Sequence, residues 1–302
     1  MLGIVILNYQ KWEETVECIQ SIVDNRPTLD EIAICIVDNN STTAVPSLLT
    51  DIIHAHPYID LLKLNGNRGY AYGNNRGWEF LANKYQLDYV IISNSDIVFY
   101  ENSLQKIIEF YKAGGKGISF PKILSPNGKV SYIDKCYYKD LSQVYRRILY
   151  KRGYFNKENA INMDNEHPVR TNLNMGACFV MDRMSMDKLL PLDENTTLYF
   201  EEMILSYKAD KAGVPITYVP YSVVLHKEGR STGKNNPFAE MCRDESVMYY
   251  SRRYIGANRI STFPLFVLEI TKFWLKSLRD NRYKSFISEH NRRLYSRWMD
   301  KQ

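Results

Sequence analysis

The chain has 302 residues, of which 45% are hydrophobic and 24% charged, and its formal net charge at pH 7 is +5. This composition is typical of a globular protein and excludes disordered, collagen-like and low-complexity chains. Residues 251–302 carry a net charge of +8 and residues 1–250 one of −3, so the C-terminal segment indicates an anionic partner, either a membrane surface or a nucleic acid.

Short hydrophobic runs alternate with segments of helical spacing over the first 120 residues. The first run has no basic region before it and no small-residue cleavage site, so we expect a buried strand there and no secretory signal. The pattern predicts strands over 2–7, 32–37, 59–64, 89–93 and 117–120, and helices over 12–23, 78–84 and 103–112. This alternation is typical of parallel β-α-β units whose sheet is covered on both faces.

Residues 131–170 interrupt the alternation with closely spaced tyrosines and basic residues, and we predict an insertion there with a helix over 141–150. Hydrophobic runs resume at 174–181 and 216–219. A tail from Thr262 onward combines large hydrophobic with basic side chains and is too short to span a bilayer. Two interpretations of the tail stay open: an amphipathic helix that docks on a membrane, or a helix pair packed on the body or on a second copy.

The five cysteines are odd in number and far apart along the chain. Their spacing argues against a disulfide scaffold and against a zinc ribbon, and it is typical of a reducing compartment. We therefore expect a cytoplasmic protein.

Three polar clusters follow three of the predicted strands: Asn8-Tyr9, Asp38-Asn39-Asn40 and Asn94-Ser95-Asp96. Ligands of open α/β sheets bind outside the carboxyl ends of the strands, where these clusters would lie together. Each cluster alone also suits a helix cap or a turn. The three together favour a shared binding site.

Eight short motifs follow one another along the chain: Ile4-Val-Ile-Leu-Asn-Tyr9, Val37 to Ser41, Asn67 to Asn75, Asn94-Ser-Asp96, Gly176 to Val180, Leu192-Asp-Glu194, Tyr199-Phe-Glu-Glu202 and His226. In this order they resemble the family-2 glycosyltransferases, and most closely the rhamnosyltransferase-like branch of bacterial capsule, O-antigen and cell-wall assembly. The resemblance covers about residues 1–255.

The resemblance implies an α/β fold of the GT-A type, with a mostly parallel central sheet flanked by helices. We expect this domain over 1–255, with a nucleotide-sugar-binding half over 1–120. The acceptor and catalytic half would span 121–255 and include the basic, Tyr-rich insertion at 131–170. A basic amphipathic helical tail would follow over 256–302.

The resemblance places a nucleotide-sugar donor at four residues, Tyr9, Asp38, Asn39 and Asn67. A tyrosine ring can stack on a base, and Asp38 and Asn39 can form hydrogen bonds with its edge. Gly69 permits a turn that brings the backbone close to the donor. For the neighbouring Arg68, a surface salt bridge is an open alternative to a donor contact.

Asn94-Ser95-Asp96 stands where the family has its Asp-x-Asp metal motif, although Asn94 replaces the first acid. The resemblance implies that Asn94 and Asp96 lie at the diphosphate, that Asp96 binds a divalent cation, and that His226 is a late metal ligand. A purely structural role for His226 is the alternative. Oxygen and nitrogen ligands suit Mn²⁺ or Mg²⁺, and such an ion would stabilise the leaving diphosphate.

Glu201-Glu202 matches the family's Glu-Asp pair, whose second acid is the expected catalytic base. Glu202 would take the proton of the acceptor hydroxyl, with Glu201 as the alternative. One carboxylate base, without a second acid for a covalent intermediate, is the arrangement of single displacement with inversion. Asp193 and Glu194 are expected to brace the site.

We therefore expect an inverting, metal-dependent glycosyltransferase of bacterial surface-polysaccharide biosynthesis. The donor would be a nucleotide-diphosphate sugar of UDP or dTDP type, and the acceptor a lipid-linked saccharide. The enzyme would lie at the inner face of the cell membrane through its basic tail. We expect no nucleic acid, and a homodimer stays open.

Two alternatives remain. One is a catalytically degenerate subunit that binds or chaperones an active transferase. The other is a sugar nucleotidyltransferase, which calls for a Gly-rich, basic loop after the first strand, where this chain has Asn8-Tyr-Gln-Lys-Trp12.

Overall fold

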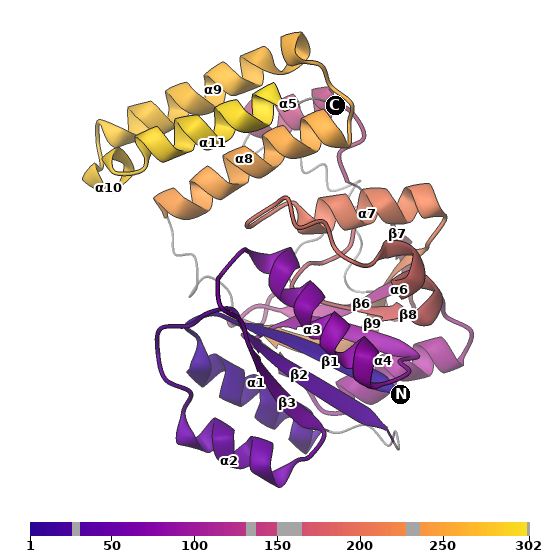
Figure 1. Ribbon diagram of the computed structural model, residues 1–302. Helices are drawn as coiled ribbons and strands as arrows, with labels where there is room; N and C mark the ends of the chain where they lie inside the picture. The colour runs from indigo at the N-terminus through magenta and orange to yellow at the C-terminus, as the bar shows by residue number, and fades with distance from the viewer. Residues whose placement is uncertain (26–30, 131–136, 150–164, 228–235, 301–302) are drawn as a thin grey trace.

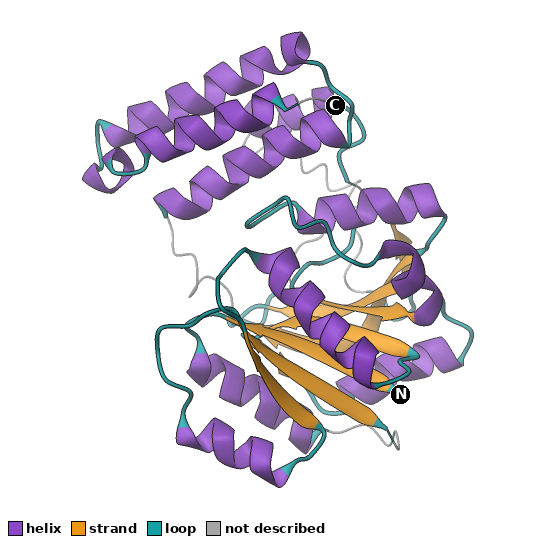
Figure 2. Cartoon of the chain, viewed as in Figure 1, coloured by secondary structure: helices purple, strands orange, loops and turns teal. Residues whose placement is uncertain are grey.

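The computed structural model describes residues 1–25, 31–130, 137–149, 165–227 and 236–300. A nine-stranded mixed sheet forms its centre, and helices cover both faces (Figures 1 and 2). The strands are β1 (Leu2–Asn8), β2 (Ile32–Asp38), β3 (Ile59–Lys63), β4 (Tyr89–Asn94), β5 (Ile97–Phe99), β6 (Ile118–Leu124), β7 (Val169–Thr171), β8 (Cys178–Asp182) and β9 (Ile216–His226).

The sheet order is β3-β2-β1-β4-β8-β6-β9-β5, with β7 paired to β9. The first four strands in this order are all parallel, as the alternating sequence pattern predicts. Beyond β4 the pairing is mixed, because β8 runs antiparallel to both of its neighbours while β6 and β9 are parallel.

Two hydrophobic layers fill the space between the sheet and its helices. Ile4 and Ile6 of β1 belong to the layer that includes residues of α1, α2 and α4, whereas Val5 belongs to the layer with α3, α6 and α7. This alternation follows from the two-residue period of a strand. The six helices are α1 (Trp12–Asp24), α2 (Ser47–Ala55), α3 (Tyr70–Lys84), α4 (Ser103–Lys112), α6 (Arg183–Leu189) and α7 (Glu201–Ala212).

Helix α3 begins at Tyr70, eight residues before the predicted start. The prediction was wrong because the two internal glycines suggested a turn. They instead allow the helix to lie close to the sheet: a Cβ on Gly73 would approach Leu7 Cδ1 to 2.4 Å, and one on Gly77 would approach Val5 Cγ1 to 2.5 Å. Of Gly69, Gly73 and Gly77, only Gly69 has a positive φ, +103°, and it forms the turn before the helix.

A helical layer lies above the α3, α6 and α7 face of the sheet (Figure 1). The predicted helix at 141–150 is confirmed as α5 over residues 141–149, and residue 150 lies outside the described residues. Helices α8, α9 and α11 of this layer share a hydrophobic core with α5, which includes Val144, Val247, Leu265 and Leu294. The helices are α5 (Leu141–Leu149), α8 (Pro237–Arg253), α9 (Arg259–Ser277), α10 (Asn281–Lys284) and α11 (Ile287–Met299).

The tail therefore forms helices that pack on the body, as one of the two interpretations predicted. Arg297 of α11 donates a hydrogen bond to the Asn195 carbonyl, 2.6 Å away, and so joins the tail to the loop before α7. No helix in the described part of the chain is long and hydrophobic enough to cross a membrane.

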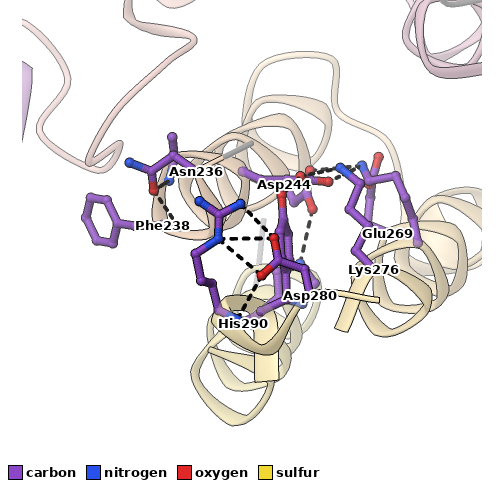
Figure 3. Close-up of polar contacts among 12 residues, drawn as sticks. Asn236, Phe238, Asp244, Glu269, Lys276, Asp280 and His290 are labelled. Atoms are coloured by element: carbon purple, nitrogen blue, oxygen red, sulfur yellow. Dashed lines mark hydrogen bonds and ion pairs between the residues drawn. The ribbon is translucent and has the colours of Figure 1, made fainter. Parts of the chain in front are cut away.

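Buried charges join α8 to the two long tail helices (Figure 3). Asp244 of α8 lies 3.2 Å from Lys272 Nζ of α9 and 3.1 Å from His290 Nε2 of α11. Glu269 pairs with the same lysine, and Lys276 pairs with Glu240. All three acids are at most 4% exposed, so each depends on its cationic partner in a medium that hydrates charge poorly.

Candidate active site

The three polar clusters converge at one edge of the sheet. Asn8 pairs with Asp38 in the register of β1 and β2, and Leu7 pairs with Asn94 in that of β1 and β4. Because these strands are parallel, their carboxyl ends lie side by side. The structure thus brings together the residues that the sequence placed in one site.

The donor side of this edge is held by a short chain of hydrogen bonds. Asp38 Oδ1 accepts from the Ser41 backbone N–H at 2.9 Å. Asn39 Nδ2 donates to Asn67 Oδ1 at 3.0 Å and to the Gly69 carbonyl at 3.2 Å. Tyr9 is 48% exposed, which leaves its ring available for stacking. Asp38, Asn39 and Asn67 therefore lie together beside the 67–69 turn, and Tyr9 directly follows the neighbouring strand β1.

Arg68 is exposed, and within the described residues it forms no ion pair. Its guanidinium carbon lies 5.1 Å from the centre of the Tyr72 ring. A cation over an aromatic face gains about 0.5–1 kcal/mol at an exposed site, so this contact leaves the charge accessible to an anionic ligand.

Asp96 and His226 are brought together by strand pairing. Asp96 immediately precedes β5, whose first residue Ile97 pairs with His226 of β9. Asp96 Oδ1 consequently lies 3.3 Å from His226 Nε2. This carboxylate oxygen is buried and accepts no aligned hydrogen bond from any described residue.

A carboxylate oxygen and an imidazole nitrogen at this separation fit a divalent cation such as Mn²⁺. Within the residues that the structure describes, no three His, Cys, Asp or Glu side chains lie close enough together to hold a metal ion by themselves. Asp96 and His226 would therefore supply two ligands, and the donor diphosphate or water the rest.

Glu201 and Glu202 open α7 after a strained backbone. Tyr199 and Phe200 both have positive φ, 73° and 72°, a conformation that non-glycine residues rarely adopt outside functional sites. Glu201 is 9% exposed and accepts a hydrogen bond from the Thr196 hydroxyl at 3.1 Å. The positive φ angles of Tyr199 and Phe200 thus direct the Glu201 carboxyl group toward Thr196 of the preceding loop.

Glu202 points to the other side, toward the start of β8. A Cβ on Gly176 would lie 3.7 Å from Glu202 Oε2, and the Gly176 carbonyl accepts a 2.6 Å hydrogen bond from the Tyr70 hydroxyl. Tyr70 also donates its backbone N–H to Thr197, at 3.1 Å. Because Tyr70 follows Gly69, whose carbonyl accepts from Asn39, contacts run without a break from Asn39 to Glu202.

The surroundings of the two carboxyl groups raise the pKa of both. Burial, and secondarily the charge of Glu202, raise the pKa of Glu201 to about 8. Burial also raises the pKa of Glu202. Burial and the two carboxylates raise the pKa of the Tyr70 hydroxyl, which keeps it a hydrogen-bond donor. At neutral pH Glu201 therefore retains its proton.

Asp193 and Glu194 brace this region, as predicted. Asp193 Oδ2 accepts hydrogen bonds from the hydroxyls of Tyr249, at 2.7 Å, and Tyr254. Burial opposes the charge of Asp193, but these hydrogen bonds outweigh it and lower the pKa. Glu194 accepts from Asn75 Nδ2 at 2.8 Å. The loop before α7 is thereby tied to α8 on one side and to α3 on the other.

The sequence did not identify Thr196 or Tyr70 as site residues. Tyr70 lies inside the Asn67 to Asn75 motif, directly after the glycine that turns the chain, and this position was a usable signal. Thr196 has no such signal, because only the fold of the loop brings it to Glu201.

Residues 3–190 match the family described as Glycosyl transferase family 2. Over 234 residues the chain is 25% identical to an N-acetylglucosaminyl-diphospho-decaprenol L-rhamnosyltransferase of Mycobacterium tuberculosis, with 71% of each chain covered. Over 264 residues it is 23% identical to the low-salt glycan biosynthesis hexosyltransferase Agl10 of Haloferax volcanii, covering 86% of this chain and 76% of that protein.

Two solved structures share the fold. GalNAc-T7 with UDP, GalNAc and Mn²⁺ gives a TM-score of 0.60 at 15% identity, and the match covers 84% of this chain but 48% of that one, so the chain spans about half its length. The mannosyltransferase PcManGT of Pyrobaculum calidifontis, with GDP-Man and Mn²⁺, gives 0.55 at 13% identity, covering 100% and 88%. These matches confirm the predicted GT-A fold. The chain belongs to glycosyl transferase family 2 and is a glycosyltransferase.

Proposed function

We propose that the enzyme transfers a hexosyl or deoxyhexosyl group, with inversion, from a UDP- or dTDP-linked sugar to a saccharide on a lipid carrier. The pathway would be the synthesis of a bacterial surface polysaccharide. The observation that carries the proposal is the contiguous path from Asn39 through Tyr70 to Glu202. It supports a nucleotide beside Asn39 and a carboxylate base at Glu202, joined by residues in direct contact.

The lipid-linked acceptor is supported by the mycobacterial relative, whose name specifies a diphospho-decaprenol substrate. The rhamnosyl and hexosyl groups named for the two relatives support the class of transferred sugar. An acceptor on a lipid carrier would bring the enzyme to the inner face of the cell membrane.

In the proposed reaction Tyr9 stacks on the base, and Asp38 and Asn39 hold the nucleoside. Glu202 accepts the proton of the acceptor hydroxyl as that oxygen bonds to the anomeric carbon. The bond between the anomeric carbon and the diphosphate oxygen breaks in the same step, so the nucleoside diphosphate leaves and the configuration inverts. Glu201 keeps its own proton and leaves Glu202 as the base.

Asp96 and His226 would hold a divalent cation at the diphosphate. When bound, such an ion neutralises charge on the leaving group. The buried Asp96 oxygen, 3.3 Å from His226 Nε2, supports this assignment, and so does the Mn²⁺ in the two solved structures of the same fold.

The test is Glu202→Gln, with nucleoside diphosphate release measured on a lipid-linked acceptor. Loss of a general base lowers kcat about 10²- to 10⁴-fold, while the thermal shift produced by UDP or dTDP with Mn²⁺ stays that of the wild type. Glu13→Gln, an exposed acid in the first turn of α1, is the matched control and keeps full activity. Unchanged turnover in Glu202→Gln would contradict the assigned base.

The degenerate-subunit alternative makes a different prediction. It expects no thermal shift with any nucleotide and no transfer by the wild type. A shift that requires Mn²⁺ and disappears in Asp96→Ala would exclude it and would support the metal site.

A further inference from the structure

Helix α9 carries an exposed hydrophobic stripe on its outer face. Twelve large hydrophobic side chains are exposed in the described part of the chain, and six of them lie on α9 or directly after it. They are 43–86% exposed: Ile260, Phe263, Val267, Trp274, Leu275 and Leu278. Their spacing keeps them within one third of the helix circumference over about 27 Å.

The stripe faces away from the protein. Leu265, Glu269 and Phe273 of the same helix are at most 2% exposed and pack toward α8 and α11, and Figure 1 shows α9 as the outermost helix of the layer. Half of a Phe or Trp side chain amounts to roughly 75–125 Å². The exposed area of six half-exposed side chains in a row exceeds the few hundred Å² of contiguous hydrophobic surface that soluble monomers usually expose. A patch of this size marks an interaction surface.

Positive charges border the stripe. Arg279 and Lys284 are exposed, and neither forms an ion pair with any described residue. Arg259, at the other end of α9, is exposed as well and donates a hydrogen bond to the Met299 carbonyl. The only acid of α9 is Glu269, which is buried beside Lys272. Asp280, which lies between Arg279 and Lys284, pairs with Arg282 at 2.7 Å. It is therefore matched by a cation of its own, and the rim of the stripe stays basic.

This charge pattern distinguishes between two occupants. In a two-fold dimer through the stripe, each subunit would present its basic rim to the same rim of its partner, and like charges would oppose association. An anionic lipid surface instead attracts each basic side chain and accepts the hydrophobic ones at the boundary between headgroups and acyl chains.

We propose that the outer face of α9 is the surface by which this enzyme lies on an anionic membrane. Phe263, Trp274 and Leu278 enter the interface, and Arg279 and Lys284 contact lipid phosphates. The role of this contact in catalysis rests on the proposed lipid-linked acceptor. The binding itself is independent of it and is measured without acceptor.

The experiment is co-sedimentation of the full chain with two vesicle types, pure phosphatidylcholine and phosphatidylcholine with about one third phosphatidylglycerol. We expect binding to the second type, together with a blue shift of tryptophan emission that is absent in Trp274→Phe. The triple variant Phe263→Ser, Trp274→Ser, Leu278→Ser should stay in the supernatant. The control Leu48→Ser with Met184→Ser removes two equally exposed hydrophobic residues elsewhere and should bind like the wild type.

The charge variant Arg279→Gln with Lys284→Gln should lower the partition coefficient roughly thirty-fold, as expected for two basic residues that each contribute about 1 kcal/mol. Wild-type protein that remains in the supernatant with both vesicles would overturn the proposal. A wild-type dimer that the triple variant makes monomeric would also overturn it, in favour of a second copy as the occupant.

The proposed function can fail separately. It fails if the protein shows neither a nucleotide-dependent thermal shift nor transfer, whatever the vesicles do. If both proposals hold, the triple variant keeps transfer to a water-soluble acceptor and loses transfer to an acceptor embedded in vesicles.

Discussion

Glu201→Gln is expected to stabilise the protein, and to do so increasingly as the pH rises. In the folded protein the pKa of Glu201 is about 8, against its ordinary 4.5. Between these two values the folded chain holds a proton that the unfolded chain has released. The free energy of unfolding therefore falls with rising pH across this window. Glutamine copies the protonated acid, so the variant lacks this loss.

The magnitude follows from the same two values. Each pKa unit corresponds to about 1.4 kcal/mol, so ionised Glu201 costs the folded state about 5 kcal/mol relative to the unfolded chain. The difference in unfolding free energy between variant and wild type should be near zero below pH 4.5. It should reach its full value above about pH 8, where the melting temperatures would differ by roughly 10 °C.

Urea unfolding between about pH 5 and pH 9 measures this difference directly. Glu13→Gln serves as the control, because Glu13 is also in the first turn of a helix but is exposed. Its unfolding curves should run parallel to those of the wild type. If the curves of Glu201→Gln do so as well, Glu201 ionises normally in the folded protein, and its assignment as the protonated partner of Glu202 is wrong.

Three further variants test the packing around the site by urea unfolding. Gly77→Val places side-chain atoms against Val5 and Val37 and should cost about 2 kcal/mol, whereas Gly66→Val, with nothing within 4 Å, should cost little. Asp244→Ala removes the carboxylate that Lys272 and His290 share, while Lys272 keeps Glu269 as a partner, and should cost about 1.5–3 kcal/mol. A loss below about 1 kcal/mol would show that water reaches this cluster. Asp193→Asn weakens the hydrogen bonds from Tyr249 and Tyr254 and should cost about 2 kcal/mol, and an unchanged midpoint would refute the bracing role.

The parallel half of the sheet could be predicted closely from the sequence. Its strands are short hydrophobic runs, and β1, β2 and β4 each extend one residue beyond the predicted end. Strand β9 extends much further than predicted, to His226. Pro220 lies inside it, where the register with β6 shifts from Pro121 opposite Val219 to Lys122 opposite Val223. A bulge accommodates proline because the ladder is already interrupted at that point.

The meeting of the donor residues was also predictable, since parallel strands bring their carboxyl ends together. The different environments of Glu201 and Glu202 were not. Two adjacent acids at a helix start look alike in a sequence, and only the 193–198 loop, with Thr196 above Glu201, tells them apart. That loop is held by α8, whose residues lie some 50 positions further along the chain.

Helix α8 is the element that links the catalytic pair to the outer surface of the molecule. On its inner side Tyr249 fixes Asp193, and Ser246 donates to the Leu198 carbonyl at 3.1 Å, next to the strained Tyr199. On its outer side Asp244 pairs with Lys272 of α9. Strain before α7 persists only where its surroundings over-determine the backbone, and α8 supplies much of that constraint. The buried charges between α8 and α9 therefore do more than attach a tail, because they hold in place the helix that keeps the 193–198 loop over Glu201.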